Sequence, residues 1–444
     1  MEHAIPERRI GPWTAALLVV ASMVGTGVFT TAGLLVRDLG SPTAVLVAWA
    51  VGGVAALSGA LAYAELVAAL PENGGEYQLL ARIYHPFVGF IAGWATFVVG
   101  FAAPVAASAL AFSAYLDAVF PGVARVPAGL ALVAVTSIVH AARVSHGSGF
   151  QNLFTAAKIA LIVGFVALGF VAGDPMLIVQ GATRPVAGAI FSSAFAVGLV
   201  YVSFAYSGWN AAAYVAGEMR EPARNVPRAL VLGASIVTAL YVSLNYVFFA
   251  AAPVSHLSGV VEVASVASEG LLGGIGSRIA SAIIALGLVS TVGAMTMTGP
   301  RVYEAMGRTY PSLRWLTVRR AGSGPVVAIA LQSGLAAVMM LTASFDALLT
   351  YTGFVLTLGS AATVAGVFVL RAREPALARP YRAFGHPFTT LVYLALAAWM
   401  VIASILERPQ VALAGGATLA LGAVLYLLLR RRTPEPAKRE GWRP

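Results

Sequence analysis

The chain is a succession of long apolar runs separated by short polar connections. A membrane-spanning helix must cross about 30 Å of hydrocarbon, which takes roughly 20 mostly apolar residues. Twelve runs are of this order: residues 11–36, 42–70, 87–117, 126–142, 149–172, 187–216, 228–252, 278–306, 325–343, 346–371, 388–406 and 410–430. The pattern predicts an all-α integral membrane protein with 12 transmembrane helices.

The connections between these runs are too short for a separate soluble domain. The longest are residues 253–277, 307–324 and 372–386, so a water-soluble catalytic module is excluded. The first run follows the charged stretch "PERRIG" and is longer than the apolar region of a signal peptide. We therefore expect it to be retained as a span.

The basic residues predict the orientation, because Lys and Arg gather on the cytoplasmic side of short loops. With the N-terminus inside, and apart from Lys158 within a span, few of the 28 Lys and Arg residues fall on the opposite face: Arg37, Arg125, Arg184, Arg278 and Arg408. This predicts a multi-pass protein of the cytoplasmic membrane with both termini in the cytoplasm. Topology and anionic lipid then explain the net charge of +10, and no nucleic-acid partner is needed.

The chain contains no cysteine and six histidines. Disulfides, thiolate metal sites and a disulfide-linked partner are therefore excluded. The histidines form no ligand-spaced pair on a helix, so we expect no metal and no other cofactor. A monomer suffices for function.

Glycines interrupt the first and the sixth run at corresponding positions. The interruptions are "SMVGTG", residues 22–27, and "FAYSGWN", residues 204–210. Glycines in spanning helices often serve only close packing, but matched interruptions are typical of inverted repeats around a midplane binding site. We expect a first repeat in residues 1–186 (spans 1 to 5), a second in residues 187–386 (spans 6 to 10), and spans 11 and 12 with a basic tail in residues 387–444.

A helix broken at mid-membrane frees backbone groups that lipid cannot satisfy, so the break must line a cavity. The amides of Gly25, Thr26 and Gly27 would start the second half-helix and suit a carboxylate. The carbonyls of residues 21–23 and 204–206 would face a cation. A zwitterionic amino acid carries both charges. Glycine would allow its close approach and a positive φ, so valine at Gly25 or Gly27 should leave expression intact but abolish binding.

Several motifs resemble the amino acid–polyamine–organocation superfamily, close to its L-type amino acid transporter branch. They are "GTGVF" in span 1, "YAELVAALPENGGEY" at residues 63–77, "FAYSGWN" with "GEMREPARNVPRAL", "STVGAMTMTGPRVYEAMGR" in span 8 and "RPYRAFGHP" after span 10. The resemblance implies the fold of bacterial leucine transporters, with a 5+5 inverted repeat and two extra C-terminal helices.

The resemblance also implies the site residues. The substrate-binding set is Ser22, Met23, Gly25, Thr26, Gly27, Phe204, Ala205, Tyr206, Ser207 and Trp209. Phe204 would also act as a gate over the substrate, with Trp209 packed behind it. Tyr206 and Trp209 can instead be ordinary core aromatics, and Asn210 can bind either substrate or a freed carbonyl.

Lys158 lies in the apolar fifth span, where an unpaired cation is costly. The resemblance implies that its ammonium takes the place of a sodium ion, with Ser290, Thr291 and span 1 carbonyls as partners. We expect sodium-independent transport in which Lys158 contributes to proton coupling. The alternative is that Lys158 snorkels to the cytoplasmic interface.

Three acidic residues have other expected roles. Glu218, beside Arg220 and Arg224, is expected in a cytoplasmic network that latches the inward gate. Glu65 is expected to be structural rather than proton-carrying, and Asp346 to be solvated in an outer loop.

Spans 1, 6, 8 and 10 carry no carboxylate near the proposed site, so a cationic side chain would lack a partner. This favours a secondary transporter of neutral L-amino acids. The alternatives are an obligate amino acid exchanger, an antiporter of cationic amino acids or polyamines, and a sensor that does not transport. A channel would need a continuous polar pore, and an enzyme a nucleophile pair or metal cluster; the sequence offers neither.

Overall fold

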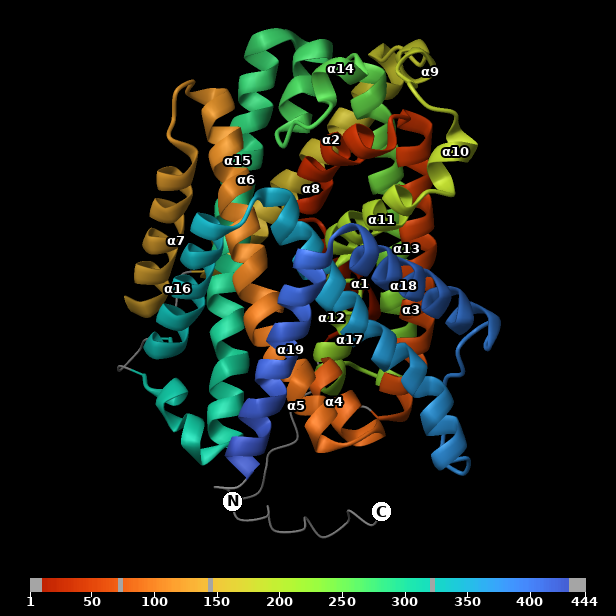
Figure 1. The fold of residues 1–444 in the computed structure, drawn as a ribbon, viewed down its shortest axis with the longest axis vertical. Helices are drawn as coiled ribbons and strands as arrows, with labels where there is room; N and C mark the ends of the chain where they lie inside the picture. The colour runs from red at the N-terminus through yellow and green to blue at the C-terminus, as the bar shows by residue number, and fades with distance from the viewer. Residues whose placement is uncertain (1–9, 71–74, 143–146, 320–323, 431–444) are drawn as a thin grey trace.

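The computed structural model is helical throughout (Figure 1) and describes residues 10–70, 75–142, 147–319 and 324–430. The first part contains α1 (Pro12–Met23), α2 (Gly27–Leu39), α3 (Pro42–Ala69), α4 (Gly75–Ile83), α5 (Pro86–Ala95), the π-helix η1 (Thr96–Ala102), α6 (Ala103–Val119), α7 (Arg125–Ala142) and α8 (Gly147–Ala172).

The middle part contains α9 (Met176–Gln180), α10 (Val186–Ile190), α11 (Ser193–Tyr206), α12 (Ala211–Tyr214), the 3₁₀-helix η2 (Ala216–Glu218), α13 (Pro222–Ala251), α14 (Val254–Leu257) and α15 (Val263–Thr309). The last part contains the 3₁₀-helix η3 (Pro311–Thr317), α16 (Val326–Thr342), α17 (Phe345–Arg373), α18 (Phe388–Glu407) and α19 (Pro409–Arg430).

Many of these helices can cross a membrane. Within the described residues, eight segments are long and apolar enough, and the bent pair of α1 and α2 makes a ninth. Shorter apolar helices cover three further predicted runs: residues 156–172 of α8, α11 and α16. The protein is therefore an all-helical, multi-pass membrane protein, and the number of twelve spans stays a prediction.

Local sequence explains where several spans begin and end. Side-chain oxygens of serines accept the free amides of the first turn: Ser41 from Ala44 at 3.3 Å in α3, and Ser192 from Phe195 at 3.2 Å in α11. Gly40 ends α2 in the left-handed conformation, with a φ of 63°.

Two predicted connections are more helical than expected. The connection 253–277 contains α14 and the first part of α15, whose axis breaks at Gly273, where φ is 69°. The connection 307–324 contains η3. Short helices therefore form in these segments although they lack a long apolar run.

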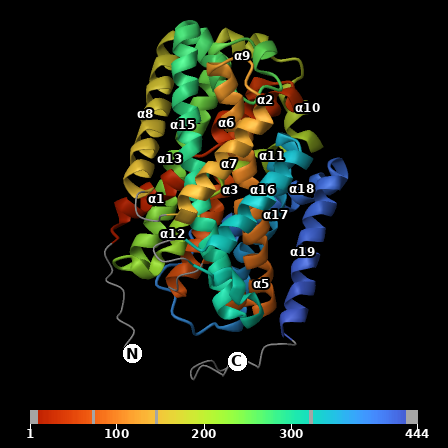
Figure 2. The ribbon, with the colours of Figure 1, turned by 90° about the vertical axis from the view of Figure 1, so that its left-hand side faces the viewer.

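Small residues bring the helices close together. A side chain at Gly53 would collide with Thr238, where α3 packs on α13, and one at Gly233 would collide with Val19, where α1 packs on α13. The helix α19 lies on the outside of the molecule (Figure 2) and exposes leucines such as Leu413 and Leu421. Such a surface suits contact with lipid.

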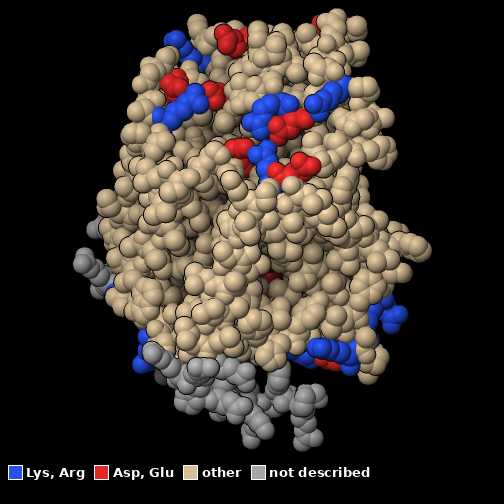
Figure 3. Space-filling view, viewed as in Figure 1, with Lys and Arg blue, Asp and Glu red and all other residues tan. Residues whose placement is uncertain are grey.

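The charged residues lie in two zones. Figure 3 shows basic and acidic side chains toward the upper and lower ends of the molecule, with a broad belt of other residues between them. A belt with so little charge is what the hydrocarbon of a bilayer requires.

Candidate functional site

The first break lies between α1 and α2, which are bent by 46° relative to each other. Within the described chain, the amides of Gly25, Thr26 and Gly27 donate to no backbone carbonyl. The Cβ of a side chain built at Gly25 would meet only Met23 O, at 3.8 Å. The amide of Gly25 therefore has room beside it, and unpaired amides at a helix N-terminus suit an anion.

The second break lies between α11 and α12, at residues 207–210. Gly208 takes a φ of 97°, which a residue with a side chain rarely adopts. The amide of Ser207 returns to the carbonyl of Phe204 at 3.1 Å. The chain therefore leaves the helix by a tight turn at the predicted interruption.

The two breaks are in direct contact. A Cβ at Gly27 would come within 2.5 Å of Ala205 Cα, and one at Gly208 within 2.7 Å of Ser22 O. Gly27 and Gly208 therefore permit backbone contact, whereas Gly25 borders free space. Neither Gly25 nor Gly27 has a positive φ, so the expected conformational role of these two glycines is wrong and their role is one of space.

Tyr241 of α13 links both breaks and was not identified from the sequence. Its hydroxyl donates to Met23 O at 2.5 Å, with Ala205 O also in reach at 3.2 Å. Both carbonyls were expected to face a substrate cation. The Met23 carbonyl accepts from Tyr241 and keeps a second lone pair, so that expectation stays a prediction. The seventh run contains a second tyrosine, Tyr246, and tyrosines are frequent in cores, so no signal in the sequence singled out Tyr241.

Lys158 of α8 is buried, with 5% of its surface exposed. Its ammonium donates to Val24 O and to Thr291 Oγ1, both at 3.2 Å. Gly287 of α15 makes room for its aliphatic stem. Lys158 therefore points to the first break and does not snorkel to the interface. Ser290 is buried beside Thr291 but has no hydrogen bond to the ammonium within the described residues.

Some of the other predicted site residues lie at the breaks, and others pack in the core. Thr26 Oγ1 lies 2.5 Å from Ser108 Oγ of α6, which fastens the first break to the third span. Phe204 is almost fully buried at the end of α11, and Ser207 is half-buried. The Tyr206 hydroxyl donates to Trp49 O of α3 at 3.0 Å.

The ring of Trp209 packs edge-on against Tyr63 of α3 and Tyr393 of α18, with ring centroids 4.7 and 6.3 Å apart. The geometry favours the core interpretation of Tyr206 and Trp209.

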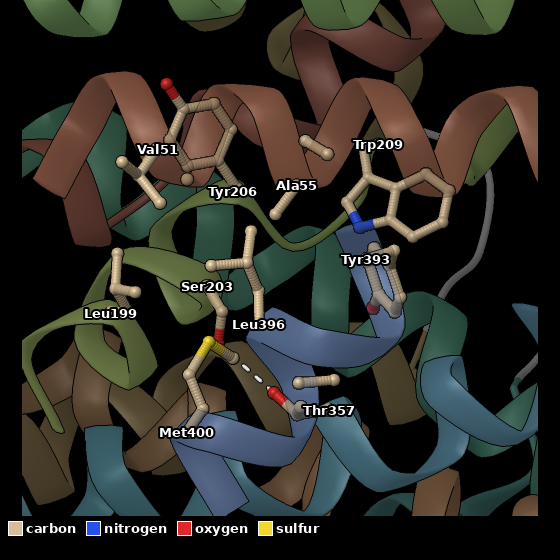
Figure 4. A pocket seen from close by; sticks show the side chains of 13 residues that line it. Val51, Ala55, Leu199, Ser203, Tyr206, Trp209, Thr357, Tyr393, Leu396 and Met400 are labelled. Carbon is tan, nitrogen blue, oxygen red and sulfur yellow. Dashed lines mark hydrogen bonds between the residues drawn. The ribbon is translucent and has the colours of Figure 1, made fainter. Parts of the chain in front are cut away.

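Figure 4 shows a cavity between α3, α11, α17 and α18 that these two rings border, together with Ser203 and Thr357. Its volume is about 40 Å³, room for a few waters at most. It is too small to be the substrate site.

Ion pairs account for two of the acidic residues. The Glu65 carboxylate accepts from Arg371 Nε at 2.8 Å and Nη2 at 2.7 Å, and from the amide of Ala383 at 2.7 Å. A structural role follows for Glu65. Asp346 lies 3.6 Å from Arg408 and 4.0 Å from Arg37. It belongs to the first turn of α17 rather than to an outer loop, and its side chain stays partly exposed.

Glu218 is exposed, and its carbonyl accepts from the amide of Ile10 at 3.2 Å. Arg224 pairs with Glu221 at 3.8 Å, and within the described part of the chain no ion pair joins Arg224 to Glu218. The amide of Arg220 donates to Ile10 O at 3.0 Å. The backbone thus ties the start of α1 to the segment after the second break, and a gating role for Glu218 stays a prediction.

Two interrupted helices in contact, with a buried ammonium beside the first break, are typical of one class of protein, the helical membrane carriers. The chain belongs to the amino acid permease family, whose sequence profile matches residues 10–428. It is therefore an amino acid transporter and not an enzyme. Among the described residues, no three His, Asp or Glu side chains are grouped to hold a metal ion.

Three named relatives are similar over most of their length. Asc-type amino acid transporter 1 of Mus musculus is 29% identical over 444 residues, covering 96% of this chain and 82% of the relative. Large neutral amino acids transporter small subunit 2 of Homo sapiens is 29% identical over 439 residues, covering 95% and 80%. Serine/threonine exchanger SteT of Bacillus subtilis (strain 168) is 29% identical over 396 residues, covering 88% and 89%.

Proposed function

We propose that this protein carries neutral L-amino acids across the cytoplasmic membrane by alternating access, without sodium and coupled to protons. The observation that supports the proposal is the first break. Its free amides at Gly25, Thr26 and Gly27 suit a substrate carboxylate, and Lys158 places a cation against Val24 O. An ammonium that can lose its proton is suited to proton coupling, and its charge would repel a sodium ion at the same carbonyl.

The names of the relatives support a neutral substrate. They refer to large neutral amino acids and to serine and threonine. One relative is called an exchanger, so obligate exchange is the second candidate. A cationic amino acid or polyamine substrate, and a non-transporting sensor, are the remaining alternatives.

Uptake of labelled amino acid into proteoliposomes, with the pH and sodium gradients varied independently, tests the proposal. We expect the labelled amino acid to accumulate saturably, to an extent that depends on the pH gradient and not on the sodium gradient. Neutral amino acids should compete for uptake, whereas arginine should not. Labelled uptake that requires an internal amino acid would identify an exchanger, and uptake that requires sodium would contradict the proposal.

Lys158→Met tests the coupling role directly. The methionine fills the space of the lysine stem but removes the charge at Val24 O. We expect loss of pH-driven accumulation, with Leu413→Met on the exposed face of α19 as the control. A fully active Lys158→Met protein would show that the ammonium has no part in transport.

The arrangement in the membrane is part of the proposal. We infer twelve spans in two inverted repeats followed by α18 and α19, with both termini in the cytoplasm. The distribution of Lys and Arg supports the orientation. One relative is named a small subunit, but this chain has no cysteine for a disulfide-linked partner. We propose that the monomer suffices.

A further inference from the structure

Glu76, at the start of α4, is a buried carboxyl group held by three different parts of the chain. Only 8% of its surface is exposed. One oxygen, Oε1, accepts from the Tyr63 hydroxyl of α3, from Ser360 Oγ of α17 at 3.0 Å, and from Asn210 Nδ2 at 3.2 Å. Asn210 belongs to the second break, so the cage of Glu76 includes the interrupted helix itself. We call these three partners the Glu76 cage.

Within the described residues, no basic side chain forms an ion pair with Glu76, whereas Glu65 pairs with Arg371. The titratable groups that face Glu76 are phenols: Tyr63 from α3, Tyr214 from α12 and Tyr393 from α18. Of the other elements packed on α4, α17 contributes the Ser360 hydroxyl, and α5 has no titratable group that interacts with the carboxyl among the described residues.

Burial and hydrogen bonding act in opposite directions on the pKa of the Glu76 carboxyl. Burial raises the pKa of the Glu76 carboxyl, although the hydrogen bonds of the cage partly oppose this. The remainder of α4 is fastened to α17 by the ion pair of Arg82 Nη1 with Glu374 Oε1, at 2.6 Å.

The Glu76 cage can hold the carboxyl group in either protonation state. The hydroxyls of Tyr63 and Ser360 can donate or accept a hydrogen bond, whereas the amide nitrogen of Asn210 only donates. A hydroxyl that donates to the carboxylate can rotate and accept from the acid. Such a cage differs from an arginine pair, which stabilises only the ionised form.

We propose that Glu76 is a proton-binding residue of the transport cycle, protonated while Asn210 and Ser360 enclose it and deprotonated when they separate and admit water. The inference rests on the proposed alternating access and proton coupling, and adds a proton site distinct from Lys158. In each cycle the O–H bond of the acid breaks, and its proton passes to water on the side to which the cage opens. The carboxylate later takes a proton from the opposite side, so charge and protons balance.

Infrared spectroscopy of the purified full chain tests whether Glu76 holds a proton. We expect a carbonyl-stretch band of a protonated carboxylic acid at neutral pH, absent in Glu76→Gln and present in the exposed control Glu407→Gln. The band should disappear at a pH above the ordinary range of Glu. A wild-type spectrum without this band, or one unchanged in Glu76→Gln, would overturn the proposal.

Should Glu76→Gln not fold, Ser360→Ala keeps the carboxyl group and removes one hydroxyl of the cage. In this variant, the band of the protonated acid should disappear at a different pH from that seen in the wild type. An unchanged midpoint would show that the cage does not control the proton.

Transport assays test whether that proton is carried. Glu76→Gln imitates the neutral acid, so we expect it to exchange labelled for unlabelled amino acid but to lose at least tenfold of the accumulation driven by a pH gradient. If wild type and Glu76→Gln both accumulate substrate, this inference alone fails. If wild type is not driven by a pH gradient, the proposed coupling fails with it. If arginine competes for uptake by the wild type but not by Glu76→Gln, the carboxyl group takes part in substrate selection, and this too would overturn the proposal.

Discussion

At the scale of single residues, the glycines of the first break have different neighbours. A Cβ at Gly25 has only Met23 O within 4 Å, whereas a Cβ at Gly27 would overlap Ala205. Substitution of either glycine by valine was expected to leave expression intact. The structure restricts that expectation to Gly25, because overpacking a close backbone contact costs about 1–3 kcal/mol or more.

Gly25→Ala and Gly27→Ala separate these roles. We expect Gly25→Ala to keep the melting temperature of wild type and to weaken substrate binding more than tenfold, because its methyl group enters the open space. Gly27→Ala should instead lower the melting temperature and the yield. Thermal unfolding in detergent with and without substrate measures both. Normal binding by Gly25→Ala would refute the placement of the substrate at this break.

The buried acid Glu76 predicts a pH dependence of stability. Since its pKa is raised in the folded protein, the folded state binds a proton that the unfolded chain has already released. This contribution is complete below the ordinary pKa of Glu and is lost as the pH rises through the raised value. The melting temperature of wild type, relative to that of Glu76→Gln, should therefore fall as the pH increases. A difference that does not vary with pH would contradict the raised pKa.

At the scale of elements, the two interrupted helices act as a unit because α13 joins them. Tyr241 binds Met23 O, and its reach to Ala205 O places it at the contact of the two breaks. The helix α13 also packs along both α1 and α3. We therefore expect a movement of one break to displace the other.

Tyr241→Phe should loosen this junction. The ring remains packed against Trp49 and Tyr206, but the buried carbonyl of Met23 loses its donor, which costs about 1–3 kcal/mol. We expect a lower melting temperature and a change in the transport rate of more than fivefold. Tyr246→Phe, on the same helix and only partly buried, is the control. Equal behaviour of the two variants would show that the hydroxyl of Tyr241 does not join the breaks.

At the scale of the whole molecule, the absence of cysteine makes the orientation testable. Ala124 follows α6 and Ser312 lies in η3, and both are exposed. In intact cells, we expect a membrane-impermeant maleimide to label Ala124→Cys and not Ser312→Cys. Permeabilised cells should allow both to react, which controls for accessibility. The reverse pattern in intact cells would place the termini outside.

The sequence alone predicted most of the architecture. The membrane class, the positions of most spans and the two interruptions follow from apolar run length and from glycine at residues 25, 27 and 208, because these signals are local. Helix length and backbone freedom depend on neighbouring residues in the chain. The resemblance added the residues of the two breaks and Lys158.

The tertiary structure alone decided what these residues touch. Contacts such as Tyr241 with Met23, Gly27 with Ala205, and Glu76 with Asn210 join positions more than a hundred residues apart. No local pattern encodes such distances, since they depend on how whole helices pack. For the same reason, the sequence could identify Glu76 as part of a motif but could not indicate that its carboxyl group is buried among hydroxyl and amide groups.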